Sequence, residues 1–317
     1  LKLELDLKKG ALDTDIKSLK KAARQTIGPE LEKRIQIIID TGLIELNNDF
    51  KIYWNNCSIA KLSTGNDYLN PNFELIIDDG ADHTQKQKLN EYISKWINNK
   101  INLVLKSLID LKSLKDKNSS VKALAFQLYE NNGVLKREQV SEYLKTLGQN
   151  DRKVLRDMGV KFGRYHVFLY QLIKPEAVSL RTLLWKNFHQ RYYSLKPPTF
   201  GLNFLDDKEL TNKNFMLLCG FEKFDTLFVR IDILERLFML IINSSDSKKI
   251  KMTPEMLNLL GCSKDNFKKL LQKMNYKIFD EVNDTYFKYS PIKTIKKVSS
   301  KKVSSENPFK ILKNLNL

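Results

Sequence analysis

The chain has 317 residues, 42% of them hydrophobic and 29% charged, so it is long enough to bury the cores of two or three domains. Its 54 Lys and Arg against 37 Asp and Glu give a formal charge of +17, which favours RNA, DNA or another polyanion as partner. The codon bias of an AT-rich genome would also raise the lysine content. No apolar run is long enough to span a bilayer and no signal peptide is recognised, so we expect a cytoplasmic protein without a membrane partner. No CxxC pair is present, so we expect the cysteines to be reduced.

Residues 1–115 are predicted to form a helical segment with a small β-hairpin element. Two strand-like runs, Leu43–Leu46 and Lys51–Trp54, flank a polar turn and predict the hairpin. Asp82 and Gln85 have the spacing of a capping box. They precede the clearest helical pattern in the chain, in which apolar residues keep i, i+3, i+4 spacing for about five turns.

Residues 120–198 are predicted to form a helical domain with a basic hairpin. The expected elements are helices over 121–131, 137–147, 151–158 and 175–188, and a hairpin over 160–170. Cations and aromatic residues alternate where the third helix meets the hairpin. We predict that nucleic-acid phosphates are bound there by Arg152, Arg156, Lys161 and Arg164. The alternative is that the neighbouring rings of Phe162 and Tyr165 belong to the hairpin core and the cations are solvated surface.

Residues 199–290 are predicted to form a winged-helix-like domain. Thr253-Pro254-Glu255 is a strong helix start, Gly261 ends that helix, and a second helix and a two-stranded wing follow. Lysines lie off the apolar face of the second helix, and we predict phosphate contacts from Lys264, Lys268 and Lys269. The alternative is that the unit serves only for packing or for binding other proteins, with its lysines as solvated surface. Residues 291–317 are predicted to be a disordered basic tail.

One local pattern recurs three times along the chain. A short helix ends in a small or polar residue, an apolar or aromatic residue follows, and a hairpin begins. The pattern occurs at Met158-Gly159-Val160, Cys219-Gly220-Phe221 and Met274-Asn275-Tyr276. It suggests a repeated helix-turn-helix unit with a wing, although three short matches can also arise by chance.

We find no catalytic constellation in the sequence. His83, His166 and His189 are scattered, and none lies at a useful spacing from a Ser, a Cys or a second His. Asp78-Asp79-Gly80 followed by Asp82 lacks the remaining ligands of a calcium loop and is better explained as a turn and a helix cap. The GxxxxGK[ST] loop of P-loop ATPases is absent. We therefore predict no catalytic site, no metal site and no cofactor in this chain.

Several stretches resemble, in the same order, the region that follows the motor in alphaproteobacterial helicase-related proteins. These are superfamily 2 enzymes similar to the RNA helicase of the mitochondrial degradosome. The resemblance covers roughly residues 20–317 and no motor motif. Its stretches are Ala60-Lys61-Leu62 with Asn70-Pro71, ALAFQLYE at 123–130 with Gly133-Val134-Leu135, LRDMGVKFG at 155–163 with Tyr165-His166, LIKP at 172–175 with Leu183-Leu184-Trp185, VRIDILERL at 229–237, TPEMLNLLGCS at 253–263, and Asn307-Pro308-Phe309.

The resemblance implies the nucleic-acid-binding accessory portion of an ATP-dependent RNA or DNA helicase, as a fragment that lacks the motor. The motor domains would precede Leu1, which is not a Met, and ATP and Mg²⁺ are expected only for them. A ribonuclease partner is conceivable in such a family, with its identity unknown. The expected fold is mainly α with short β-hairpins, forming multi-helix accessory domains that include a winged-helix-like C-terminal unit. The alternatives are a stand-alone winged-helix DNA-binding protein and a protein-interaction scaffold.

Overall fold

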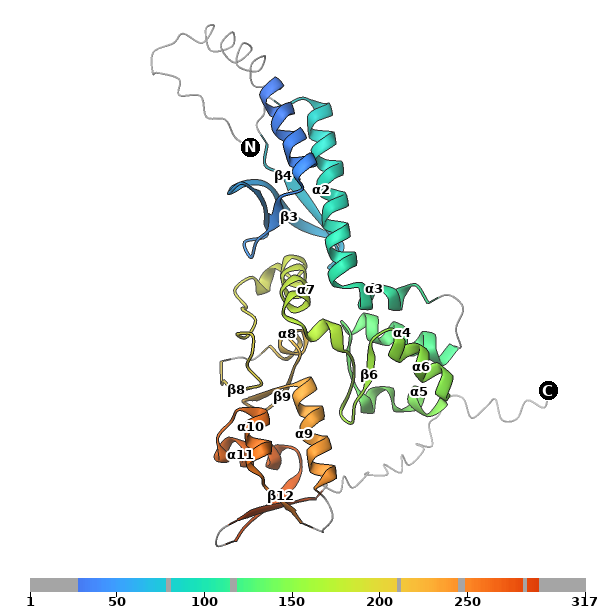
Figure 1. Ribbon diagram of the computed structural model, residues 1–317, viewed down its shortest axis with the longest axis vertical. Coiled ribbons are helices and arrows are strands. Elements are labelled where there is room, and N and C mark those ends of the chain that lie inside the picture. Colours follow the sequence, from blue (N-terminus) through green and yellow to red (C-terminus); the bar gives the residue numbers. More distant parts are fainter. Residues whose placement is uncertain are drawn as a thin grey trace, which may run out of the picture.

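The computed structural model describes residues 28–77, 81–114, 119–209, 212–244, 249–281 and 284–290 (Figure 1). The predicted tail at 291–317 and the acidic turn at 78–80 lie outside the described residues. The chain forms an elongated molecule, with residues 28–112 at one end and residues 231–289 at the other (Figure 1). The described residues form a mixed α/β fold, with helices as the larger part and four small antiparallel sheets.

The N-terminal unit packs two helices against a four-stranded sheet. A helix covers residues 28–41 and lies beside α2 (His83–Val104), where Lys88 pairs with Glu32. The predicted hairpin is confirmed as β1 (Ile44–Leu46) and β2 (Lys51–Trp54), but the meander continues in order through β3 (Cys57–Asp67) and β4 (Asn70–Leu75).

The start of α2 has the predicted capping box. The Asp82 carboxylate accepts the Gln85 backbone N–H at 2.7 Å, and the Gln85 side-chain oxygen accepts the Asp82 N–H at 3.2 Å. The helix ends earlier than its apolar pattern predicts, because the backbone leaves helical geometry at Leu105. The pattern resumes in α3 (Lys106–Lys112), which packs against the next helix.

Three consecutive segments then share a common order of an α-helix, a lone strand, one or two α-helices and a two-stranded hairpin, and we call them repeats 1, 2 and 3; repeats 1 and 2 also contain a 3-10 helix. Repeat 1 consists of α4 (Ser119–Glu130), β5 (Val134–Lys136), the 3-10 helix η1 (Arg137–Val140), α5 (Ser141–Thr146), α6 (Gln149–Asp157), β6 (Val160–Phe162) and β7 (His166–Leu169). The 3-10 helix η2 (Tyr170–Ile173) connects it to repeat 2, which consists of α7 (Pro175–Phe188), the 3-10 helix η3 (Gln190–Tyr192), β8 (Phe204–Asp206), α8 (Lys213–Leu218), β9 (Phe221–Phe224) and β10 (Leu227–Arg230). Repeat 3 consists of α9 (Ile231–Asn243), β11 (Ile250–Lys251), α10 (Pro254–Leu260), α11 (Lys264–Lys273), β12 (Tyr276–Asp280) and β13 (Thr285–Tyr289).

The three sheets have the same topology. In each repeat the single strand pairs with the last strand of the hairpin, giving the orders β5-β7-β6, β8-β10-β9 and β11-β13-β12. The lone strands have two or three residues, which is too short for a periodic signal, and the sequence did not predict them. Between the lone strand and the hairpin, repeat 2 has one described α-helix where repeats 1 and 3 have two.

The recurring sequence pattern marks equivalent positions in the three repeats. Gly159, Gly220 and Asn275 all have left-handed backbone conformations, with φ of 92°, 86° and 66°. Each carbonyl accepts a hydrogen bond from the residue that follows the last strand of its repeat; the donors are the N–H groups of Tyr170 at 3.3 Å, Ile231 at 2.9 Å and Ser290 at 2.8 Å. This conformation ends the helix and aims the chain into the hairpin, which explains the preference for Gly and Asn.

A fully buried arginine joins repeats 1 and 2. Arg181 on α7 has no exposed surface, and its guanidinium donates to the carbonyls of Asn132 at 2.6 Å, Leu172 at 3.0 Å and Leu218 at 2.5 Å. These carbonyls lie after α4, in η2 and at the end of α8, where helix ends carry partial negative charge. Burial lowers the pKa of Arg181 to about 10. Helix-end dipoles therefore compensate this charge, since no described carboxylate pairs with it.

Candidate nucleic-acid interface

The structure divides the four predicted cations of repeat 1 into two pairs. Arg152 on α6 is half-buried, and its guanidinium donates to the carbonyls of Leu144 at 2.7 Å and Leu147 at 3.3 Å, where α5 ends. Arg156 and Lys161 are exposed and form no ion pair within the described parts of the chain. Arg156 lies 5.8 Å from the centre of the Phe162 ring, which keeps its guanidinium against the hairpin.

Arg164 lies at the tip of the β6–β7 hairpin, and a residue of repeat 3 holds this tip. The carboxylate of Glu235 on α9 accepts the backbone N–H groups of Arg164 at 2.5 Å, Tyr165 at 2.9 Å and His166 at 2.9 Å. The Arg164 guanidinium lies 5.5 Å from the centre of the Phe238 ring, also on α9. The tip of the predicted basic hairpin is therefore held against α9.

Gly163 makes this contact possible. A Cβ at this position would lie 2.3 Å from the carboxyl carbon of Glu235, much closer than a side chain allows. The glycine lets the carboxylate reach the backbone amides of the hairpin tip. We call this arrangement of Gly163, Glu235 and the three amides the hairpin clamp.

A buried ionic network lies next to the hairpin clamp and connects all three repeats. His166 Nε2 is 2.9 Å from Glu222 on β9, His166 Nδ1 is 3.5 Å from Glu235, and Lys136 on β5 is 2.7 Å from Glu222. Burial opposes charge on His166, but its hydrogen bond to Glu222 and the neighbouring carboxylate of Glu235 raise its pKa above the usual range. Burial opposes charge on Glu222 as well, but His166 and Lys136 hold its pKa below the usual range. The network therefore favours a charged His166 beside an ionised Glu222.

The cations of repeat 3 are more exposed to solvent. On α11, Phe267, Leu270 and Leu271 are buried, while Lys264 and Lys269 are exposed and form no ion pair with a described acid. The third predicted residue, Lys268, bonds both carboxylate oxygens of Asp280, at 2.7 and 2.8 Å. Of the predicted set in repeat 3, Lys264 and Lys269 are thus the two that remain available to an anion.

The hairpin of repeat 3 adds two lysines that the sequence argument missed. Lys277 on β12 and Lys288 on β13 are directly opposite in the strand register, and both are exposed. Like charges at opposed positions repel and destabilise a hairpin unless an anion lies between them. The pairing of the two strands across 283–284 was a sequence prediction, and this register could have revealed the pair.

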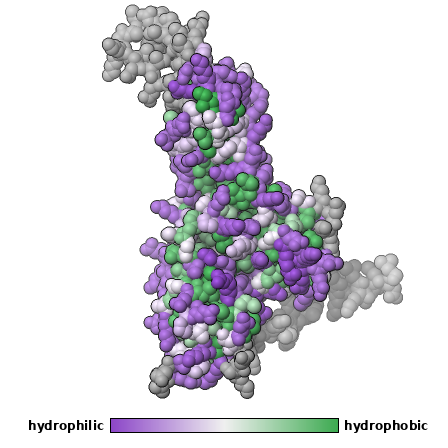
Figure 2. Space-filling model, in the orientation of Figure 1, coloured by the Kyte–Doolittle hydropathy of each residue, from purple (hydrophilic) through white to green (hydrophobic). Residues whose placement is uncertain are grey.

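The structure does not bring the two predicted cation sets together. Figure 1 shows α6 and α11 well apart, on opposite sides of the molecule. In Figure 2 hydrophilic residues dominate the margins of the visible face, and hydrophobic residues concentrate toward its middle. The partners that fix Arg152 and Arg164 also lie outside the sequence prediction. Glu235 and Glu222 are distant in sequence from the hairpin, and no local signal marks them.

Other site classes receive no support within the described residues. No group of three or more His, Cys, Asp or Glu there has the geometry to hold a metal ion, and no described helix is long and apolar enough to cross a membrane. Comparison of the chain with protein-family models, with curated proteins and with solved structures gives no match.

Proposed function

We propose that the chain is the nucleic-acid-binding accessory portion of an ATP-dependent superfamily 2 helicase, and that its three repeats are winged-helix-like units in tandem. The observation that carries nucleic-acid binding is the set of exposed lysines of repeat 3: Lys264 and Lys269 on α11, and the opposed pair Lys277 and Lys288 on the hairpin. The helicase assignment is supported by the collinear resemblance of the sequence alone.

The chemistry of this surface suits phosphates better than base edges. Lysine is a compact point charge that meets phosphate oxygens, and the mutual repulsion of Lys277 and Lys288 is relieved when a phosphate lies between them. The exposed lysine set contains no arginine for bidentate contacts with guanine. Binding should therefore depend strongly on salt and weakly on sequence.

The test is the affinity for fluorescently labelled oligonucleotides, measured by anisotropy between about 50 and 200 mM salt. Lys264→Glu/Lys269→Glu is expected to weaken binding at least about tenfold and to reduce the slope of log K against log salt by about two. Lys61→Glu/Lys95→Glu is the matched control, because it changes the same charge at exposed lysines of the N-terminal unit. Equal effects of both variants, or an affinity independent of salt, would contradict the phosphate contacts.

The competing functions predict different outcomes of the same measurements. A stand-alone winged-helix DNA-binding protein would prefer one duplex sequence by about 10³- to 10⁷-fold, the range typical of specific binding. A protein-interaction scaffold would show no oligonucleotide binding that charge reversal can remove. The helicase assignment predicts that coding DNA upstream of Leu1 continues the reading frame and encodes a GxxxxGK[ST] loop; a stop codon directly upstream would refute it.

A further inference from the structure

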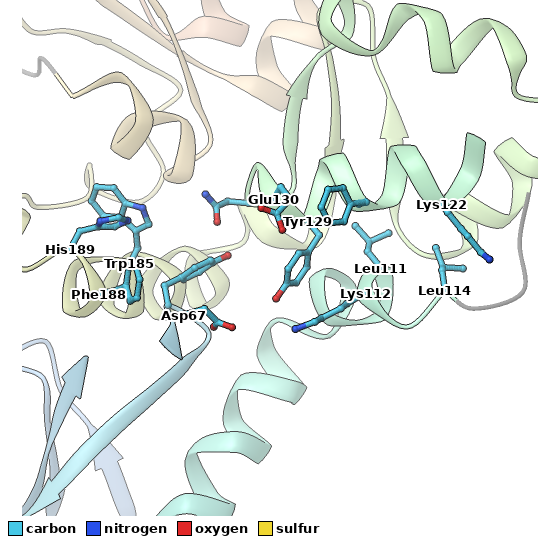
Figure 3. Close-up of a pocket in the computed structure, with 13 residues that line it drawn as sticks. Asp67, Leu111, Lys112, Leu114, Lys122, Tyr129, Glu130, Trp185, Phe188 and His189 are labelled. Atoms are coloured by element: carbon cyan, nitrogen blue, oxygen red, sulfur yellow. The ribbon is translucent and has the colours of Figure 1, made fainter. Parts of the chain in front are cut away.

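A cavity of about 720 Å³ lies where the N-terminal unit meets repeats 1 and 2 (Figure 3). Its walls come from the β3–β4 turn, α3, α4 and α7. A second cavity of about 300 Å³ shares several of its lining residues and extends toward η3 and the start of α8. We call the two together the junction groove, and its shared residues are Glu130, Asn132, Trp185 and His189.

The walls of the junction groove are rich in aromatic rings. Figure 3 shows Trp185 and Phe188 of α7, and His189 directly after it, across the cavity from Tyr129 of α4. Phe126, one helical turn before Tyr129, also lines the cavity, and 59% of its surface is exposed. A large apolar ring exposed on a cavity wall presents a face on which a planar ligand can stack.

Further aromatic rings lie next to Trp185 along the groove. The Trp185 ring is 4.6 Å from that of His189 and 5.1 Å from that of Tyr192, and the Trp185 and Tyr192 planes are nearly parallel, 16° apart. The Trp185–Tyr192 pair is thus stacked, whereas the Trp185–His189 pair is tilted by 51°, and Trp185 itself is largely buried. A planar ligand that enters the groove therefore contacts several neighbouring rings rather than one isolated ring.

Cations lie against the rings at both ends of the groove. Lys112 is 5.3 Å from the centre of the Tyr129 ring, and Arg191 is 4.7 Å from that of Tyr192. Figure 3 shows the Lys112 amine pointing into the space between Tyr129 and Asp67. No ion pair among the described residues joins Lys112 to Asp67; the Asp67 carboxylate accepts the backbone N–H groups of Leu69 and Asn70 at 2.8 and 2.9 Å.

Neutral polar groups and one carboxylate complete the lining. The Tyr68 hydroxyl is buried and has no hydrogen-bond partner among the described residues. Burial raises the pKa of Tyr68, and burial together with Arg191 lowers that of His189, so both are uncharged near neutral pH. Glu130 is exposed and can accept hydrogen bonds from the exocyclic amino groups of bases.

We propose that the junction groove binds unpaired nucleobases of a single-stranded nucleic acid. Aromatic rings stack on bases of any sequence, cations beside them meet the backbone, and neutral donors and acceptors pair with base edges. Cations at both ends and two connected cavities fit a strand of several nucleotides better than one free nucleotide. The inference rests on the proposed nucleic-acid binding, but it uses different residues from the lysines of repeat 3.

Fluorescence of Trp185 reports directly on the groove. The chain has three tryptophans, Trp54, Trp96 and Trp185, so Trp54→Phe/Trp96→Phe leaves a single emitter that lines both cavities. Short oligomers of deoxythymidine or uridine should quench its emission in a saturable manner, and a duplex of the same length should not. Absence of quenching by the single strands, equal quenching by the duplex, or binding of uridine monophosphate as tightly as the oligomers would each overturn the proposal.

Phe126→Ala is the decisive substitution, since its exposed ring contributes little to the core. It should weaken single-strand binding by about 5- to 150-fold, the range expected for loss of one base-stacking ring. Phe200→Ala removes another ring that is 50% exposed and lies outside the groove, so it should leave the affinity unchanged. Equal affinities for these two variants would overturn the proposal.

The measurements can refute either of the two proposals without refuting the other. If Lys264→Glu/Lys269→Glu weakens binding while Phe126→Ala does not, the repeat 3 surface stands and the groove proposal falls. If Phe126→Ala weakens binding while the lysine variant behaves like its control, the groove stands and the proposed role of repeat 3 falls. Circular dichroism of each variant should match that of the parent chain, because all these side chains are exposed.

Discussion

The carboxylate of Glu235 lies 2.9 Å from the backbone nitrogen of His166, although 69 positions of sequence separate the two residues. The same oxygen is 3.5 Å from the imidazole Nδ1 of His166. A residue of repeat 3 thus fixes both the backbone and the ring orientation of a residue of repeat 1. This relationship makes the hairpin clamp a test of whether the repeats fold as one body.

Removing the clamp should destabilise the fold. Glu235→Ala leaves three hairpin amides without their acceptor. Hydrogen bonds to a charged group contribute a net of about 1.5–3 kcal/mol each, and in the variant water can solvate part of the exposed hairpin tip. We expect a loss of about 2–3 kcal/mol in the free energy of urea unfolding. Arg236→Ala, an exposed neighbour on the same helix, should change it by less than about 0.5 kcal/mol. Equal losses for both variants would show that the clamp contributes nothing specific.

Stability should depend on pH through His166 and Glu222. The folded pKa of His166 is raised above its unfolded value of 6.5, so its stabilisation is complete below 6.5 and is lost as pH rises through the folded pKa. The folded pKa of Glu222 is lowered below 4.5, so its stabilisation is present above 4.5 and is lost as pH falls through the folded pKa. Their joint contribution is therefore greatest between these limits.

Urea unfolding followed from about pH 6 to about pH 9 measures this dependence. The parent chain is expected to lose stability over this range. His166→Gln keeps a neutral side chain in place and should flatten the decline. An identical slope in the two proteins would assign the pH dependence to other groups.

The buried guanidinium of Arg181 should be difficult to replace. Arg181→Met leaves three buried carbonyls without their donor, and each unsatisfied group costs about 1–3 kcal/mol, so a loss of at least about 3 kcal/mol is expected. Arg181→Lys keeps the charge but cannot present the same fork of donors, so it should recover only part of this loss. Full recovery by Lys would show that charge alone matters.

The three left-handed positions should respond as equivalent sites. Gly159→Ala and Gly220→Ala place a Cβ in a conformation that disfavours it by about 1–2 kcal/mol, and thermal unfolding should report losses of that order. Asn275→Gly should cost little or nothing, because the backbone there already adopts the glycine-like conformation. A large loss for Asn275→Gly would show that its side chain, rather than its backbone, is required.

Long local patterns predicted the helices well. The expected helix at 175–188 matches α7, and the expected helix at 151–158 differs from α6 by two residues at its start and one at its end. These predictions succeed because apolar spacing, Pro175 and the glycine stops are local signals. The short strands β5, β8 and β11 were missed, because their pairing with distant hairpins determines them more than local propensity does. For a related reason, the sequence could not show that Arg152 and Arg164 are engaged by other parts of the protein whereas Arg156 and Lys161 are not. The acceptors that engage the first pair come from the end of α5 and from α9, and no spacing rule connects α9 to the hairpin tip.

The last strand of repeat 2 ends at Arg230 and the first helix of repeat 3 begins at Ile231, with no residue between them. A junction without intervening residues has no hinge, and Arg230 stiffens it further by bonding Asp232 at 2.6 and 3.0 Å. Repeats 2 and 3 are consequently joined without a linker. Under the proposed function, a nucleic acid that contacts both repeats would follow the spacing that their packing sets.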